Sequence, residues 1–111
     1  MDKLNSYRQF ICQVLNEYAQ MKPGNGDIQV YTIFDMSGDH YQIFHAGWDG
    51  HQRIFGALIH IDLIENKIWI QYDGTETGVA NDLVSLGVPK QDIVLAYHSP
   101  FMRQFDGFAV V

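Results

Sequence analysis

The 111-residue sequence is poor in cysteine and proline, with one Cys and three Pro, and it has no long hydrophobic run. A single cysteine, Cys12, cannot form an internal disulfide and fits a reducing cytoplasm. We interpret Cys12 as a half-buried helix residue, because nothing near it in the sequence would depress its pKa. No apolar stretch approaches the roughly 18 residues of a membrane span, and the N-terminal segment lacks the apolar core of a signal peptide. These absences predict a cytoplasmic protein without a membrane segment.

Positive charge is also scarce, since 7 Lys and Arg face 13 Asp and Glu for a net charge of −6. A protein that grips duplex DNA neutralises several phosphates, on the order of 6–10. The cations of this chain are dispersed among acids and form no basic run. We therefore expect no direct nucleic-acid binding by this chain alone. The cations are Lys3, Arg8, Lys22, Arg53, Lys67, Lys90 and Arg103.

The sequence is rich enough in apolar residues, at 47%, to build one globular core, and we assign residues 1–111 to a single domain. Apolar residues first recur every three or four positions, which predicts an amphipathic helix of about five turns. Residues 23–26, Pro-Gly-Asn-Gly, are expected to end it. The apolar stripe consists of Leu4, Tyr7, Ile11, Val14, Tyr18 and Met21.

Four segments then read as strands in an antiparallel meander, at residues 27–35, 41–46, 53–64 and 67–72. The first has apolar groups on both sides, which predicts a strand that is central or covered on both faces. Gly56 marks a bulge or bend, and residues 47–51 are expected to form a turn. A short helix follows, capped by Asp73 and Glu76 or alternatively by Thr75, and ended at Gly87. Residues 93–97 form a short strand, 99–105 a helical turn and 107–111 a last strand or tail. The predicted class is α+β: an N-terminal helix, the four-stranded meander, a short helix, and one or two C-terminal strands.

The last two strands of the meander form a hairpin around a two-residue turn at Glu65-Asn66. Counting outward gives one apolar face and one polar face, and a slip by one residue would mix them. The apolar face pairs Leu63 with Ile68, Ile61 with Ile70, and Ile59 with Tyr72. The polar face pairs Asp62 with Trp69, and His60 with Gln71.

No motif carries a specific chemistry. The sequence has no HExxH, no CxxC and no two-histidine-plus-carboxylate set. The nearest approach to a metal site is His60-x-Asp62, which we interpret as lining the solvated face of the hairpin. His98-Ser99 lacks the elbow of a serine hydrolase. We predict no metal, no cofactor and no catalytic residue.

Two tryptophans stand in unusual places. The hairpin count puts Trp69 on the polar face, where either the first helix or the C-terminal strands of this chain cover it, or another protein chain does. Trp48 lies in a glycine-flanked turn, with the same two alternatives of local packing or an interface. Aromatic anchors with a polar rim suit a protein–protein patch. We predict a partner-binding or dimer surface made by Trp48, His60, Asp62, Trp69, Gln71 and Asp73.

The sequence resembles the XisI family, the fdxN-element excision controlling factors of cyanobacteria. The resemblance spans nearly the whole chain. It is carried by Tyr18-Ala19-Gln20, Lys22-Pro23, Asn25-Gly26-Asp27-Ile28, Asp39-His40-Tyr41, Gly47-Trp48-Asp49-Gly50, His60-Ile61-Asp62, Lys67-Ile68-Trp69-Ile70-Gln71, Asp73-Gly74-Thr75-Glu76 and the segment from Gly87-Val88-Pro89-Lys90 to Asp92-Ile93-Val94-Leu95. Family members often have histidine where this chain has Tyr72, a departure that weakens a histidine site in the hairpin.

The resemblance implies a small cytoplasmic α+β protein that acts with an XisH-like companion to control a site-specific recombinase during DNA excision. Our leading hypothesis is therefore a regulatory module without catalysis of its own, which binds proteins and forms a homo-oligomer. The net negative charge suits contact with a basic, DNA-handling partner. The alternative is a small-ligand-binding or enzymatic domain that uses the face of His60, Asp62, Gln71 and Asp73.

Overall fold

The computed structural model describes residues 2–21, 27–76 and 78–111, and it is an α+β fold as predicted. The sheet has the order β1-β2-β3-β4-β5; β1 to β4 form the antiparallel meander, and β5 runs parallel to β4. The elements are α1 Lys3–Ala19, β1 Asp27–Asp35, β2 His40–Asp49, β3 Gln52–Ile64, β4 Lys67–Asp73, α2 Val79–Ser85, η1 Lys90–Asp92, β5 Ile93–Leu95 and α3 Pro100–Arg103.

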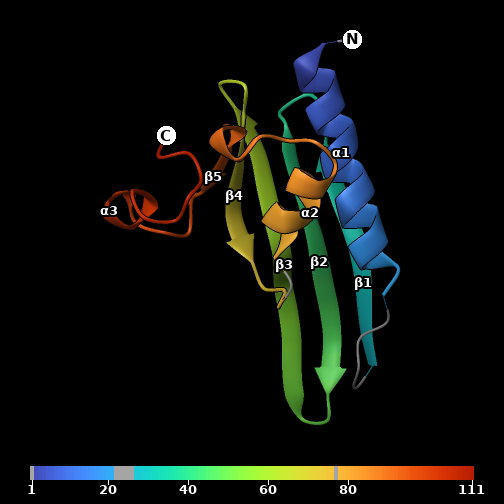
Figure 1. The fold of residues 1–111 in the computed structure, drawn as a ribbon. Helices are drawn as coiled ribbons and strands as arrows, with labels where there is room; N and C mark the ends of the chain where they lie inside the picture. Colours follow the sequence, from blue (N-terminus) through green and yellow to red (C-terminus); the bar gives the residue numbers. More distant parts are fainter. Residues whose placement is uncertain (1, 22–26, 77) are drawn as a thin grey trace.

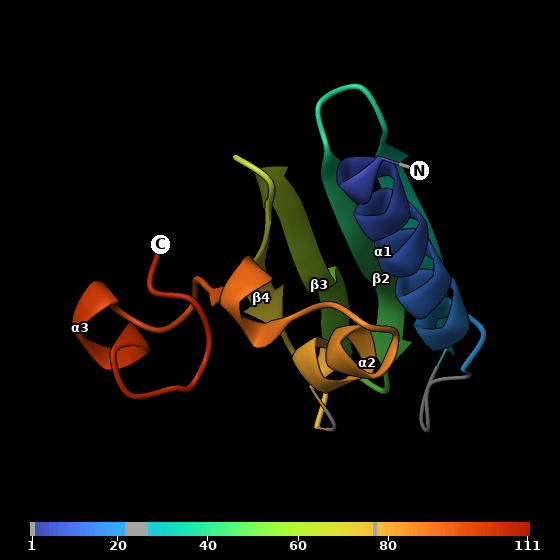
Figure 2. The same cartoon turned by 45° about the horizontal axis from the view of Figure 1, so that its top comes forward.

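Helices α1 and α2 lie on the same face of the sheet, which we call the inner face (Figures 1 and 2). Helix α3 and the C-terminus lie beyond β4, at the β5 side of the molecule (Figure 1). The opposite, outer face of β1, β2 and β3 has no described helix over it. Among the described residues, no helix is long and apolar enough to cross a membrane.

The core is the contact between the inner face and the apolar stripe of α1. The stripe buries four residues, Tyr7, Ile11, Val14 and Leu15. Burying one aliphatic side chain of this kind contributes roughly 1.5–3 kcal/mol, so this layer stabilises the fold. The sheet side of the core consists of Tyr41, Ile43, Ile59, Ile61, Leu63, Ile68, Ile70, Ile93 and Leu95, and α2 adds Val79, Ala80 and Leu83.

The prediction that residues 27–35 form a central strand is wrong, because β1 is an edge strand. Its second apolar side, with Tyr31 and Ile33, points to the outer face and remains about 40% exposed. Trp48 also lies in a strand and not in the predicted turn, since β2 continues to Asp49. Gly47 permits this extension, because a Cβ there would lie 2.0 Å from the Asp27 carbonyl oxygen of β1.

The hairpin turn is confirmed, with φ of +50° at Glu65 and +68° at Asn66. The pairs Leu63–Ile68, Asp62–Trp69 and Ile61–Ile70 are also confirmed. The outer two pairs are wrong, because the register shifts between His60 and Ile61. An extra residue in β4, Gln71, makes a bulge, and beyond it His60 pairs with Tyr72 and Ile59 with Asp73.

A second bulge interrupts the pairing of β2 with β3. The register shifts between Ile43 and Phe44, where Leu58 is the extra residue of β3. The predicted irregularity at Gly56 therefore lies two residues away from the observed one. Gly56 itself pairs with His45 and has a φ of +153°.

The second helix begins at Val79, later than predicted. Asp73 still caps it, but across the intervening loop: Asp73 Oδ2 accepts the Val79 N–H at 2.7 Å, and Oδ1 accepts the Thr75 N–H at 2.9 Å. Glu76, the predicted partner in the cap, is exposed. The end is confirmed, with Gly87 at φ +111° and its N–H donating to the Val84 carbonyl.

The C-terminal part is close to the prediction. The strand of residues 93–97 is shorter, since β5 ends at Leu95. Helix α3 is capped by Ser99, whose Oγ accepts the Met102 N–H. Ala109 forms a parallel bridge with Val94. The expected helix end at residues 23–26 lies outside the described residues.

Candidate functional site: the outer face of the sheet

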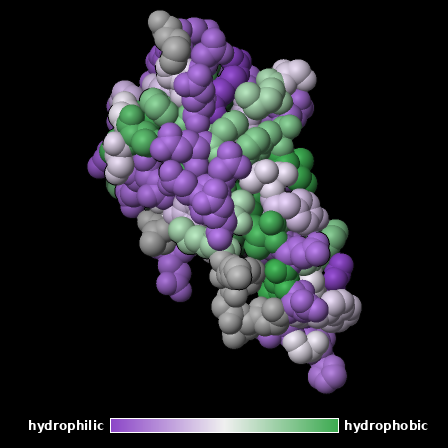
Figure 3. Space-filling view, turned by 90° about the vertical axis from the view of Figure 1, so that its right-hand side faces the viewer, coloured by the Kyte–Doolittle hydropathy of each residue, from purple (hydrophilic) through white to green (hydrophobic). Residues whose placement is uncertain are grey.

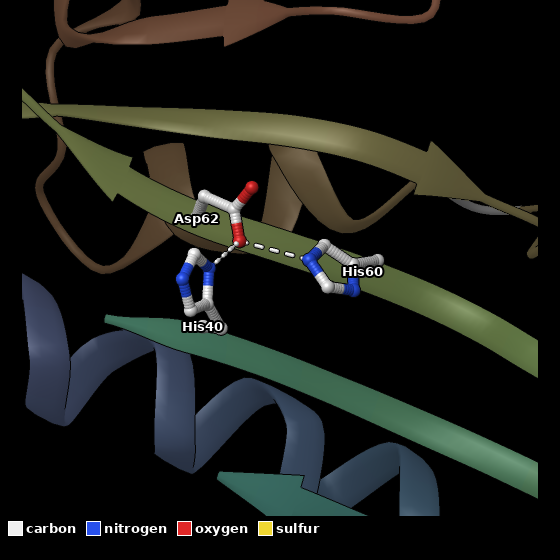
Figure 4. A group of neighbouring side chains, drawn as sticks. All are labelled: His40, His60 and Asp62. Carbon is white, nitrogen blue, oxygen red and sulfur yellow. Dashed lines mark hydrogen bonds and ion pairs between the residues drawn. The ribbon is translucent and has the colours of Figure 1, made fainter. Parts of the chain in front are cut away.

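A polar cluster occupies the part of the outer face where β2, β3 and β4 meet. Its centre is the Asp62 carboxylate, which is 9% exposed and is the buried charged group among the described residues. Asp62 Oδ1 accepts hydrogen bonds from His40 Nδ1–H at 2.7 Å and from His60 Nε2–H at 2.8 Å (Figure 4). Gln71 Nε2–H donates to the other oxygen, Oδ2, at 3.2 Å. A buried carboxylate needs such donors, and here it has three.

The sheet pairing explains why these side chains meet. His40 is the cross-strand partner of Asp62, and His60 lies two residues before Asp62 on the same side of β3. The hydrogen bond to Asp62 raises the pKa of His40. The other ring nitrogen of His60, Nδ1, lies 3.4 Å from Gln42 Oε1.

The sequence suggested a ligand-binding face of His60, Asp62, Gln71 and Asp73. The observed cluster lacks Asp73 and gains His40. His60, Asp62 and Gln71 are brought together, whereas the Asp73 carboxylate is occupied with the cap of α2. His40 is the member that sequence reasoning missed. The ligand atoms of His40, His60 and Asp62 lie within 4.8 Å of one another, so a two-histidine-plus-carboxylate set exists in space although no sequence motif shows it.

The remaining part of the outer face carries aromatic side chains. Phe44 lies at its centre, with its ring centroid 5.7 Å from that of Tyr31 and 4.8 Å from that of Phe55. The Arg53 guanidinium lies 5.3 Å from the Trp48 ring centroid and 5.2 Å from that of Phe55. We call this set, Tyr31, Phe44, Trp48, Arg53 and Phe55, the aromatic patch.

The aromatic patch is open to solvent. Phe55 is 65% exposed and Trp48 is 51% exposed. Both lie on the β2–β3 hairpin, which extends past the helix layer (Figure 1). From the side where α1 lies in Figure 1, hydrophilic residues cover one part of the surface and hydrophobic residues form a band beside them (Figure 3).

Trp69 has surroundings that Trp48 lacks. Its ring is half-buried, and the Arg103 guanidinium of α3 lies 5.5 Å from the ring centroid. It also lines a small cavity together with Val111 near the C-terminus. The C-terminal segment of this chain therefore covers part of the indole, so the need for another chain at this residue is smaller than at Trp48. Its place in a partner-binding surface stays a prediction.

Other candidates for chemistry have structural roles. Cys12 is half-buried in α1, and burial raises the pKa of its thiol, which lowers its reactivity. Ser99 caps α3, and the neighbouring His98 donates from Nδ1–H to Asp106 Oδ2 at 3.1 Å.

The described cations are engaged within the chain. Lys3 pairs with Asp92, and Arg8 pairs with Asp39. Lys67 donates to the Val111 carbonyl, and Lys90 lies over the Phe108 ring. With Arg53 and Arg103 placed over aromatic rings, these six cations all contact protein groups.

Fold and site define a class: a small α+β protein with one helix-covered sheet face and one open face that carries aromatic side chains and a His–Asp–His cluster. The family model described as XisI protein matches residues 1–110, and the chain belongs to the XisI family.

Two solved structures from Anabaena variabilis ATCC 29413 are similar to this chain. A XisI-like protein shares 36% identity at a TM-score of 0.89, with 97% of this chain and 99% of that chain covered. The fdxN element excision controlling factor XisI shares 29% identity at a TM-score of 0.81, with 99% of this chain and 100% of that chain covered. Curated proteins give no match.

Proposed function

We propose that this chain is a non-enzymatic accessory factor of the cytoplasm that controls site-specific DNA excision by binding a companion protein of the XisH type and, through it, a recombinase. Membership of the XisI family supports the excision role, since a structural relative is named as the excision controlling factor of the fdxN element. The observation that carries the protein-binding mechanism is the exposed aromatic patch.

The chemistry of the aromatic patch is that of a protein interface. Trp, Tyr, Phe and Arg are enriched in the centres of protein–protein contacts. A solvent-exposed indole and phenyl ring forfeit the free energy that burial of about 150–250 Å² each would supply. Arg53 spans Trp48 and Phe55, so the three side chains form one preorganised anchor on the projecting hairpin.

Charge favours a protein over a nucleic acid as the first contact. The chain carries a net charge of −6, and its described cations are already engaged. It therefore has few charges to neutralise phosphates, while a basic, DNA-handling protein is attracted to it. The same patch also serves a homo-oligomer, with two copies meeting outer face to outer face.

Co-purification with an XisH-like protein tests the proposal. We expect a complex at micromolar concentration, weakened at least about 30-fold by Trp48→Ser or Phe55→Ser, as truncation of a central anchor predicts. Phe101→Ser is the matched control, because Phe101 is also 65% exposed but lies on α3.

The same experiment also contains the outcomes that contradict the proposal. Absence of a complex, both on co-expression and on mixing, contradicts the companion role. A complex lost with Phe101→Ser but kept with Phe55→Ser places the contact on the C-terminal segment instead. Light scattering of the chain alone measures the homo-oligomer, which we expect to dissociate in the Phe55→Ser variant.

A further inference from the structure

We infer that His40, His60 and Asp62 form a binding site for a divalent transition-metal ion of the zinc type. This site is separate from the aromatic patch and does not depend on the proposed role in excision. It lies on the outer face and is built from two adjacent strands, β2 and β3 (Figure 4).

The first argument is the convergence of the donor atoms. One carboxylate oxygen, Asp62 Oδ1, lies 2.7 Å from His40 Nδ1 and 2.8 Å from His60 Nε2. A tetrahedral ion with ligand bonds of about 2.0–2.2 Å separates neighbouring ligand atoms by roughly 3.3–3.5 Å. The contacting nitrogen of each imidazole needs to retreat by about 0.5–0.8 Å from Asp62 Oδ1 to admit the ion. The side chain of His40 is 57% exposed and has room to do so.

The second argument is the set of side chains behind the donors. Metal-binding carboxylates and imidazoles are held in place by outer hydrogen bonds. Gln71 Nε2–H holds Asp62 Oδ2, which leaves Oδ1 for the ion. With the ion on Nε2, the His60 proton lies on Nδ1, 3.4 Å from Gln42 Oε1, which accepts it.

The donor set also selects the kind of ion. Imidazole suits Zn²⁺ and its neighbours in the first transition row, whereas Mg²⁺ and Ca²⁺ prefer all-oxygen sites. Three protein ligands leave a fourth position, and no described helix lies over this part of the sheet to occupy it (Figure 1). A water molecule or a side chain of a bound protein completes the coordination.

Calorimetric titration of the metal-free, tag-free chain with Zn²⁺ tests the site, and Co²⁺ absorption in the visible range reports the coordination geometry. We expect one ion per chain and a raised melting temperature. The calorimetric signal and the Co²⁺ absorption should both be lost in His40→Ala and in His60→Ala. Gln71→Ala is expected to weaken binding about 10- to 100-fold, as removal of an outer hydrogen bond does.

His98→Ala is the matched control, because His98 also contacts a carboxylate, Asp106, but belongs to no three-ligand group among the described residues. It is expected to bind Zn²⁺ as the wild type does. His40 is largely exposed, so His40→Ala should fold, which circular dichroism verifies. Absence of Zn²⁺ binding to the wild type, binding unchanged in both His40→Ala and His60→Ala, or an equal loss in His98→Ala would each overturn the site.

Discussion

The two faces of the sheet are made by the same strands, yet their surroundings differ. On the inner face, Ile43, Ile61 and Ile70 are fully buried under α1 and α2. On the outer face, the neighbouring positions carry Phe44, Asp62 and Trp69. Phe44 and Asp62 contact side chains of adjacent strands, and Trp69 contacts Arg103 of α3. The inner face therefore accounts for stability, and the outer face is free to carry the chemistry of binding.

The largest difference in the free energy of unfolding should appear when an isoleucine is replaced by alanine on each face in turn. Ile61→Ala on the inner face is expected to lower the free energy of unfolding by about 2–5 kcal/mol, because it leaves a cavity in the core. Ile33→Ala on the outer face should cost less than about 1 kcal/mol, since Ile33 is 43% exposed. Urea denaturation at low protein concentration measures both. Equal losses would mean that the outer face is also covered in solution.

The polar contacts at the edge of the inner face predict a dependence on pH. The Arg8 guanidinium, and then the Tyr41 hydroxyl, hold the pKa of Asp39 below its usual range. This contribution is complete above the unfolded pKa, about 3.9, and is lost as the pH falls through the lower folded value. Asp39→Asn should cost about 1–3 kcal/mol near neutral pH and flatten the loss of stability in acid.

Asparagine is a suitable replacement at this position, because φ of Asp39 is +60° and asparagine tolerates that backbone conformation. Thermal unfolding from pH 7 down to pH 3 compares the two proteins. If the variant loses stability in acid as steeply as the wild type, the contact between Arg8 and Asp39 does not have the assigned role.

The cap of α2 should have a smaller effect on the inner layer. Asp73→Ala removes the acceptor of the Val79 and Thr75 N–H groups and is expected to cost about 0.5–2 kcal/mol. Hydrogen exchange should show faster opening of α2 and its loop while α1 stays protected. A uniform loss of protection over both helices would indicate that α2 does not open separately.

The smallest effect on stability is expected at Trp69, and it distinguishes the surroundings of Trp69 from those of Trp48. Arg103→Ala removes the cation over the Trp69 ring, a contact of about 0.5–1 kcal/mol. In a Trp48→Phe background, the fluorescence of Trp69 should shift to longer wavelength when Arg103 is removed. In a Trp69→Phe background the emission of Trp48 should not change, since Trp48 contacts Arg53 instead. A shift in both backgrounds would mean that Arg103 acts indirectly.

Much of the fold follows from local sequence patterns. The spacing of Tyr7, Ile11 and Val14 predicts α1, and the alternation around Glu65-Asn66 predicts the hairpin, because each pattern reflects the period of one element. The misplaced start of α2 has a local reason as well. Asp73 accepts a hydrogen bond from the N–H of Val79, six residues ahead and across a loop. The capping-box rule assumes a spacing of three, so it finds the capping residue but places the first helical turn too early.

Taken alone, the sequence determined the class of the fold, the four-stranded meander and the inner pairs of the hairpin, because these depend on periodicity and on a turn that only a few residues can make. The tertiary structure decided which side chains meet on the outer face. Without the extra residue at Leu58, simple counting from the β2–β3 turn would set His40 opposite Ile61. The His40 side chain would then lie on the same side as Ile61, toward the core. The bulge moves His40 opposite Asp62. One inserted residue exchanges the two faces of a strand, and the packing of neighbouring strands decides where it is inserted. Sequence spacing therefore placed His60 beside Asp62 but could not bring His40 to them.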